Sequence, residues 1–447
     1  MKKIKRRAYA IFLLVFVIPV LLTVFLFGLA ADGGDWAAFP TNQNVFTGGQ
    51  ISLGTVSDRN GVMLMESEGG TVRFHESADV RRATFHVLGD RGGNVATGVT
   101  RVYADRLIGY NLVTGTYSIG GTGGRIGLTI DAELSRVAHA ALAGRQGAVV
   151  VMNYETGEIL AAVSNPSYDP LNRPEIREDD LNFEGVYINR AFSSAFTPGS
   201  AFKVVTAAAA LDTFDDALSR TYSCNGGFVV TGNNVRCTGN HGTIGLEEAM
   251  RVSCNPYFAQ LALDLGGNRL LSYVEQFGLN QSLNLEGVPI AAGNFAAAEG
   301  GTPALAWSGV GQSENLMNPL AMARFMGAIA RGGAPMEPRL LEYYAGGIIP
   351  RRYESEAEAP IMSGAVASHL GWILRSAAPQ ASFPGLNVAG KTGTAEVADR
   401  QPHAWFVGFL DEPDHPLAFV VIVEHGGGGL AQAVPVANTV LQAAVRE

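Results

Sequence analysis

Two residues three positions apart, Ser200 and Lys203, have the types and the spacing that nucleophilic catalysis needs. A proline and a glycine precede Ser200, and nothing interrupts a helix from there to Leu211. Such a helix would be apolar nearly all round, as is typical of a buried core helix, with Ser200, Lys203 and Thr206 on one face. Because burial disfavours the charged ammonium and lowers a lysine pKa, Lys203 could accept the proton of the Ser200 hydroxyl.

The use of lysine in this chain supports that interpretation. There are only five lysines: three lie in the first five residues, and the other two are Lys203 and Lys391. Of the 27 basic residues beyond residue 7, 25 are arginine. A guanidinium effectively always stays charged, whereas an amine can lose its proton. We therefore expect both remaining lysines to have a chemical role.

A second motif, Ser253-Cys254-Asn255, lies between helical patterns at 246–252 and 256–265. Asn255 precedes a proline, which disfavours helical geometry and predicts a loop for the tripeptide. Taken alone, the motif fits ordinary helix capping, with Asn255 as N-cap and proline at the first helical position. Together with the other motifs, a Ser253 hydroxyl and an Asn255 amide that face the nucleophile are the better interpretation.

The third motif is Gly390-Lys391-Thr392-Gly393-Thr394, in a strand-like context. The glycines, Gly393 among them, remove side chains and would let a substrate backbone lie against the strand. Lys391 with the hydroxyls of Thr392 and Thr394 could bind a carboxylate. The alternative is a glycine-rich loop with an incidental lysine.

The elements around these motifs predict an α+β fold. A helix capped by Asp131 follows residue 126, and two strands are expected at 148–152 and 159–163. A second strand pair is expected at 404–410 and 417–423, and a closing helix at 435–445. Strands at both ends with helices between them indicate one antiparallel sheet flanked by helices. Residues 51–125 look short and strand-like, with a hairpin turn at Asn60-Gly61.

The order Ser-x-x-Lys, Ser-x-Asn, Lys-Thr-Gly resembles penicillin-binding proteins and serine β-lactamases. Most of 126–447 resembles the class B penicillin-binding proteins, the monofunctional D,D-transpeptidases of peptidoglycan synthesis. The further segments that carry this resemblance are 128–131, 156–161, 165–170, 241–242, 309–312 and 405–408. Residues 58–61 and Arg81-Arg82 look like the membrane-proximal pedestal of the family, which is short here.

The resemblance implies the chemistry of each motif. Ser200 would attack the penultimate carbonyl of a stem peptide that ends in D-Ala-D-Ala, with Lys203 as base. The backbone N–H groups of Ser200 and Thr394 would hold the oxyanion. Ser253 would pass a proton to the leaving D-Ala, while Asn255 orients Lys203 and the substrate amide. An amine of a second stem peptide would then form the cross-link, and β-lactam antibiotics would acylate Ser200.

Two other functions compete with this one. A β-lactamase needs a base that activates water, and Glu314 and Asn318 have a Glu-x-x-x-Asn spacing. That segment instead resembles the Gly-Gln region of the family, and the middle residue of Ser-Cys-Asn is not Asp. A non-catalytic β-lactam or muropeptide receptor would need a signalling domain inside the cell. Only about seven residues are expected there, which is too few to form one.

The N-terminus predicts a membrane anchor. Five basic residues in 1–7 precede 24 uncharged residues, 8–31, enough to cross a bilayer. We expect a cytoplasmic basic tail at 1–7, an uncleaved single-pass helix at 8–31, a linker at 32–50 within a pedestal at 32–125, and a transpeptidase domain at 126–447, extracytoplasmic in the cell membrane. A cleaved signal peptide is the alternative. Since no glycosyltransferase domain fits into 32–125, a membrane-embedded glycan polymerase is the expected partner.

Net charge and the cysteines bear on three further questions: nucleic-acid binding, disulfide formation and metal binding. Beyond residue 7, 27 basic against 41 acidic residues give a net charge of −14, which disfavours nucleic acid as a partner. Cys224 and Cys237 could form a disulfide outside the cytoplasm, or remain as free buried thiols. No cofactor is expected, and no His/Cys cluster shows zinc spacing, so no metal is expected either.

Overall fold

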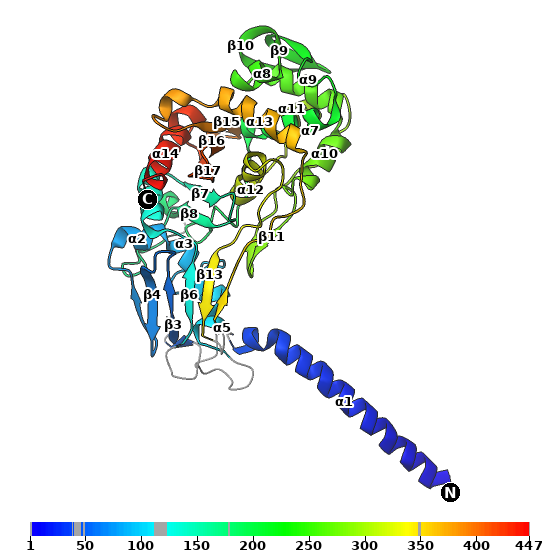
Figure 1. The fold of residues 1–447 in the computed structure, drawn as a ribbon, viewed down its shortest axis with the longest axis vertical. Helices are drawn as coiled ribbons and strands as arrows, with labels where there is room; N and C mark the ends of the chain where they lie inside the picture. The colour runs from blue at the N-terminus through cyan, green and yellow to red at the C-terminus, as the bar shows by residue number, and fades with distance from the viewer. Residues whose placement is uncertain are drawn as a thin grey trace.

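A five-stranded antiparallel sheet forms the centre of the molecule, with a second sheet below it and a long helix that extends away from both (Figure 1). This computed structural model describes residues 2–37, 39, 46–47, 50–110, 123–177, 179–346 and 350–446. The elements of the first part are α1 (Lys2–Ala37), β1 (Phe46–Thr47), β2 (Gln50–Ile51), β3 (Leu53–Ser57), β4 (Met63–Glu68), β5 (Thr71–Phe74), α2 (Ala78–Ala83), α3 (Phe85–Leu88), α4 (Val99–Val102), α5 (Ala104–Leu107) and β6 (Arg125–Leu128).

The elements that follow build the central sheet and the helices around it. They are α6 (Ala132–Leu142), β7 (Gly147–Asn153), β8 (Ile159–Asn165), η1 (Leu181–Phe183), η2 (Gly199–Phe202), α7 (Lys203–Thr213), β9 (Thr221–Val230), β10 (Asn233–Gly245), α8 (Leu246–Arg251), α9 (Asn255–Leu265), α10 (Gly267–Gln276), β11 (Leu283–Leu285), β12 (Val288–Ile290), α11 (Pro303–Val310), α12 (Pro319–Ala330), β13 (Leu341–Ala345), β14 (Arg351–Arg352), α13 (Gly364–Ala377), η3 (Gln380–Ser382), β15 (Val388–Val397), β16 (Arg400–Leu410), β17 (Leu417–Val423) and α14 (Gly429–Ala444).

The central sheet has the order β15-β16-β17-β7-β8, and every neighbouring pair is antiparallel. It joins the two strand pairs that lie far apart in the sequence, so the predicted assembly from both ends of the domain is confirmed. All of β17 is buried, and successive residues point to opposite faces of the sheet. Val420 packs in a core cluster with α7 and α12, whereas Val421 packs in another with α6 and α14. Helices therefore cover both faces.

The local signals near the sheet have mixed outcomes. Asp131 caps α6, because its carboxylate accepts a hydrogen bond from the Leu134 N–H at 2.8 Å. The hairpin turn between β3 and β4 is also confirmed. The prediction that the last helix begins at Pro435 is wrong: α14 begins at Gly429 and contains Pro435. Four short helices, α2 to α5, replace the strands expected over 78–107. Part of the linker predicted at 32–50 lies outside the described residues.

The second sheet crosses the predicted domain boundary. It is six-stranded, in the order β14-β13-β6-β3-β4-β5, and β3 and β6 run parallel. β13 and β14 come from 341–352, far along the chain, and pair with the strands that precede residue 129. The boundary at 125/126 stays a prediction, since strands from both sides of it share this sheet.

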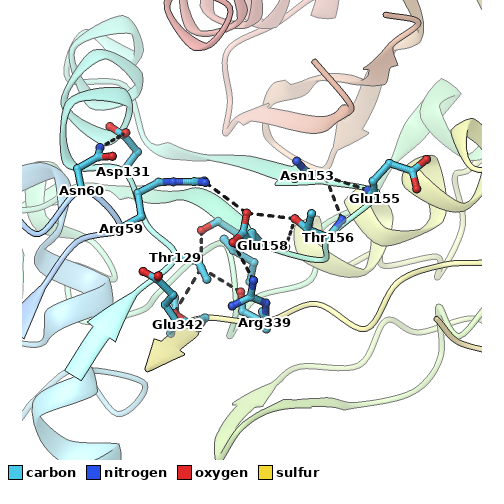
Figure 2. A network of polar contacts seen from close by, with 12 residues as sticks. Arg59, Asn60, Thr129, Asp131, Asn153, Glu155, Thr156, Glu158, Arg339 and Glu342 are labelled. Atoms are coloured by element: carbon cyan, nitrogen blue, oxygen red, sulfur yellow. Dashed lines mark hydrogen bonds and ion pairs between the residues drawn. The ribbon is translucent and has the colours of Figure 1, made fainter. Parts of the chain in front are cut away.

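A network of polar side chains joins the two sheets (Figure 2). Arg59, from the β3–β4 turn, pairs with Glu158 at 3.3 Å, and Arg339 pairs with the same carboxylate at 2.7 Å. The amide of Asn60 donates to Asp131 at 2.8 Å. Arg59 and Asn60, from the predicted pedestal, are therefore in direct contact with residues of the predicted transpeptidase domain.

A second link between these parts is a buried ion pair. Arg81 of α2 binds both carboxylate oxygens of Asp169, at 2.6 and 2.7 Å. The Arg81 side chain is 9% exposed and that of Asp169 is 4% exposed. Bidentate hydrogen bonds from the Arg81 guanidinium hold the pKa of the Asp169 carboxyl well below its usual range.

Helix α1 contains the 24-residue uncharged run and projects away from the two sheets (Figure 1). Its residues Lys2–Leu29 are long and apolar enough to cross a membrane, and nearly all of that stretch is solvent-exposed. A signal sequence near the N-terminus would show the same length and composition.

Candidate active site

Ser200 lies in the short 3-10 helix η2, one turn before α7 begins at Lys203. The predicted buried helix is confirmed, since every residue of α7 from Lys203 to Ala210 is buried. Gly199 has φ +53°, and a side chain there would collide with the carbonyl of Thr394. At Gly393 an added Cβ would lie 2.7 Å from the Pro198 carbonyl oxygen. The missing side chains let η2 press directly against β15, which brings Ser200 beside the third motif.

The Lys203 ammonium is fully buried and donates to three oxygens of the second motif. Its Nζ lies 2.6 Å from the Ser253 carbonyl, 3.1 Å from the Ser253 hydroxyl and 2.7 Å from Oδ1 of Asn255. Burial lowers the pKa of Lys203 well below its ordinary value, and the charge of nearby Lys391 lowers it further. Lys203 can therefore exist as a neutral amine that accepts a proton.

Ser253 links the two isolated lysines. Its Oγ accepts hydrogen bonds from Lys203 at 3.1 Å and from Lys391 at 3.0 Å. The residue has φ +56°, a left-handed conformation that is uncommon for a residue other than glycine and that clusters at functional sites. This backbone turns both the carbonyl and the hydroxyl of Ser253 toward Lys203.

Asn255 is expected either to cap a helix or to face the nucleophile, and the structure shows which of the two it does. Helix α9 begins at Asn255 itself, so the prediction that this residue lies outside the helix is wrong, and Cys254 is the N-cap. The Asn255 side chain makes no capping bond: Oδ1 accepts from Lys203, and Nδ2 donates to the Arg236 carbonyl at 2.9 Å. The amide faces Lys203, as the three-motif interpretation expects.

The third motif lies on β15, the edge strand of the central sheet next to η2. Lys391 is buried, and burial lowers its pKa to about 7. Thr392 is half-buried and Thr394 is exposed, so both hydroxyls are near the surface of the strand. Oγ1 of Thr394 accepts a hydrogen bond from the Gly429 N–H at 3.3 Å, and thereby ties the first residue of α14 to β15.

The eight predicted residues thus lie on three adjoining elements: η2–α7, the α8–α9 junction and β15. Thr206 is not part of the site, because its hydroxyl donates to the Gly309 carbonyl at 2.9 Å. Among the hydrogen bonds of the described residues, none involves the Ser200 hydroxyl, which is therefore available to an incoming carbonyl. The arrangement combines a free hydroxyl, a lysine able to lose its proton and an edge strand for an extended ligand.

Sequence reasoning missed a cluster next to this site. Cys224, Cys237, His241 and Cys254 come together with their ligand atoms within 4.8 Å of one another. Their sequence spacing is not that of a zinc motif, and they come together only because the β9–β10 hairpin and the start of α9 meet in space. All three cysteines are free thiols, so the disulfide considered for Cys224 and Cys237 is not formed. The sequence held one sign of the cluster: all three cysteines lie between residues 224 and 254, and Cys254 belongs to the second motif.

Three comparisons with known proteins agree with this geometry. A family model described as the penicillin binding protein transpeptidase domain matches residues 147–442. The peptidoglycan D,D-transpeptidase PbpA of Mycobacterium tuberculosis is 31% identical over 332 residues, which are 67% of each chain. The penicillin G acyl-enzyme complex of penicillin-binding protein A from M. tuberculosis superposes with TM-score 0.72 at 26% identity, over 88% of this chain and 99% of that one.

Proposed function

Because the chain belongs to the penicillin-binding protein transpeptidase family, we propose that it is a serine D,D-transpeptidase that cross-links peptidoglycan stem peptides through an acyl-enzyme on Ser200. The observation that carries the proposal is the shared hydroxyl of Ser253, on which two buried lysines with lowered pKa values converge. Few structural roles require two desolvated amines on one hydroxyl. Acyl transfer requires a base and a path for its proton.

Acylation begins when the Ser200 hydroxyl attacks the carbonyl of the penultimate D-alanine. The neutral Lys203 amine takes the hydroxyl proton as the C–O bond forms. The backbone N–H groups of Ser200 and Thr394 receive the oxyanion by analogy with the family, since η2 and β15 lie against each other.

Collapse of the tetrahedral intermediate breaks the peptide bond and releases D-alanine. The leaving amine needs a proton, and Ser253 is placed to deliver it, because its Oγ lies 3.1 Å from Lys203 Nζ. Asn255 keeps Lys203 oriented through its Oδ1 at 2.7 Å. An amine from a second stem peptide then attacks the acyl-enzyme, and the new peptide bond restores the free Ser200 hydroxyl.

The substrate lies along β15 in this proposal. An edge strand offers unpaired backbone groups, to which an extended peptide can add as a further strand. The terminal carboxylate would bind Lys391 in its ammonium form together with Thr392 and Thr394, while Gly393 leaves the backbone uncovered. The acyl-enzyme complexes of M. tuberculosis penicillin-binding protein A with penicillin G and imipenem support β-lactams as substrate mimics here.

The test is intact-mass spectrometry of the detergent-solubilised full chain after treatment with benzylpenicillin. One adduct per chain is expected, and Ser200→Ala should carry none. An adduct that persists in Ser200→Ala would reject Ser200 as the nucleophile.

The β-lactamase alternative is disfavoured by Asn318. Its side chain is fully buried and caps α12, with Oδ1 accepting from Leu320 and Ala321 N–H groups at 2.9 and 3.1 Å. Its Nδ2 donates to two backbone carbonyls, so the amide is fully occupied by structural bonds. Nitrocefin should therefore be consumed in a single stoichiometric burst, whereas sustained turnover would favour the lactamase.

We extend the proposal to the membrane. Helix α1 would be retained as a single-pass anchor with residues 32–447 outside the cytoplasm, and a membrane-embedded polymerase would supply the glycan strand. N-terminal sequencing of the membrane-bound protein should read the original start. A mature chain that begins near residue 31 would mean a cleaved signal peptide.

A further inference from the structure

We infer that Cys224, Cys237, His241 and Cys254 form a structural zinc site that holds the Ser253–Asn255 segment in place. The four ligand atoms lie within 4.8 Å of one another, and the cluster is the one group of this kind found among the described residues. Three thiols and an imidazole are a ligand set that selects zinc over the hard cations, which prefer oxygen.

The distances within the cluster match tetrahedral coordination. The Sγ atoms of Cys224 and Cys237 each lie 3.6 Å from Nδ1 of His241. With bonds of about 2.3 Å to sulfur and about 2.05 Å to nitrogen, a tetrahedral zinc has S···N edges of about 3.6 Å and S···S edges of about 3.8 Å. The four ligand atoms already lie within 4.8 Å of one another, so small side-chain adjustments suffice for all four to coordinate one zinc ion.

The hairpin is shaped to bring these ligands together. In a regular strand, residues four apart, such as Cys237 and His241, are separated by about 13 Å. The β9–β10 register is irregular between Arg236 and Gly242, and this irregularity folds both residues toward Cys224 on the facing strand. Such a bulge leaves ladder groups unpaired, and it is typically kept where it aims a side chain.

The fourth ligand is the middle residue of the catalytic tripeptide. Cys254 is fully buried, and its neighbours Ser253 and Asn255 both contact Lys203. Asn255 also donates to the carbonyl of Arg236, the residue before Cys237. A zinc ion would thus join the hairpin to the start of α9 and oppose relaxation of Ser253 from its left-handed backbone. When zinc binds, the three thiol protons leave to solvent and three Zn–S bonds and one Zn–N bond form.

The first experiment measures the metal itself, independently of catalysis. The full chain is purified in detergent without chelators, and zinc is measured by elemental and native mass spectrometry. About one zinc per chain is expected, and Cys237→Ser and His241→Ala should lose it, whereas the control His369→Ala, an exposed histidine elsewhere, should keep it. Replacement with Co²⁺ should give the absorption of a tetrahedral thiolate site.

Cysteine accessibility provides a test on the unaltered chain. All three thiols should resist alkylation in the zinc-loaded protein, react after chelation, and become protected again when zinc is restored. A Cys224–Cys237 disulfide in peptides mapped without reductant, or zinc that stays bound in both ligand variants, would overturn the inference.

The positioning role rests on the proposed function and has its own measurement. Chelation should reduce the rate of acylation by a fluorescent penicillin by about 10- to 100-fold, the scale of a small misplacement of reacting groups, and zinc should restore it. If zinc binds stoichiometrically and its removal changes the melting temperature but not acylation, the site is structural without positioning the tripeptide. Absence of acylation in the zinc-loaded chain would count against the proposed function and leave the metal result standing.

Discussion

The active site and the junction with the six-stranded sheet are stabilised in different ways. Around Ser200, backbone meets backbone: Gly199 and Gly393 leave no room for a side chain between η2 and β15. At the junction, long side chains make the contact instead: Arg59 pairs with Glu158 (Figure 2), and Arg81 pairs with Asp169. Close backbone packing fixes the positions of reacting groups, whereas removing one partner of a buried ion pair leaves an uncompensated charge and destabilises the fold. Changes in the first region should therefore alter the chemistry, and changes in the second should alter the melting temperature.

The largest effect within this comparison is expected at Lys203. Arginine keeps the charge but effectively cannot lose a proton, and it is bulkier than a fully buried site allows. Lys203→Arg should lower the second-order acylation rate constant by about 10²- to 10⁴-fold, as expected for loss of a general base. Lys391→Arg, which keeps a cation for the carboxylate, should lose much less. Melting temperatures of both variants serve as the control, and equal losses in two folded proteins would leave Lys203 as a positioning cation.

The next largest effect on acylation is expected when a single methyl group is added at Gly393. In Gly393→Ala the new Cβ would lie 2.7 Å from the Pro198 carbonyl and 3.0 Å from Trp405 Cβ, so η2 must shift. A shift of this kind near the nucleophile should reduce acylation by about 10- to 100-fold. Gly364→Ala is the matched control, because its nearest neighbour would be 3.7 Å away. Equal acylation rates in the two variants would contradict the proposed importance of backbone packing.

The pH dependence of acylation should distinguish the roles of Lys203 and Lys391. Lys203 must be neutral to act as base, so acylation should rise as pH rises through its lowered pKa. Lys391 must be charged to bind a carboxylate, and its pKa of about 7 predicts a fall in acylation as pH rises through that value. In Lys391→Arg the guanidinium stays charged, and the alkaline fall should disappear from rate profiles of the free enzyme. An unchanged alkaline limb would assign it to another group.

The smallest effect on chemistry is expected at the junction. Arg81→Ala would leave the Asp169 carboxylate buried without its partner, which should cost about 3–5 kcal/mol of unfolding free energy. Acylation of the folded protein should stay within about twofold of the wild type. Arg82→Ala is the control, since Arg82 is 40% exposed and pairs only with Asp79 one turn away among the described residues.

The same ion pair has a pH signature. Because the pKa of the Asp169 carboxyl is lowered in the folded state, its stabilisation is present above the unfolded pKa of about 4 and is lost as pH falls through the folded value. The difference in melting temperature between wild type and Arg81→Ala should therefore shrink below about pH 4. A constant difference down to low pH would mean that packing of the Arg81 stem, and not its charge, provides the stability.

Local patterns were reliable where one element carried the signal. The buried helix after Ser200, the cap at Asp131 and the strands of the central sheet all follow from the spacing of apolar residues and from capping chemistry. The same reasoning failed for 78–107, where helices of four to six residues are too short to show a helical period. It also failed at Asn255, which is the first residue of α9 although a proline follows it, and whose side chain contacts Lys203.

By itself, the sequence determined the α+β class, the eight residues of the three motifs and the two lysines free to act as amines. It could do so because residue type and short spacing already specify which chemistry is possible. Only the tertiary structure decided that one hydroxyl, that of Ser253, receives both lysines, and that β13 completes a sheet with β3 and β6. It alone also placed Cys224, Cys237, His241 and Cys254 within 4.8 Å. These arrangements join segments tens to hundreds of residues apart, and they depend on packing geometry that no local pattern encodes.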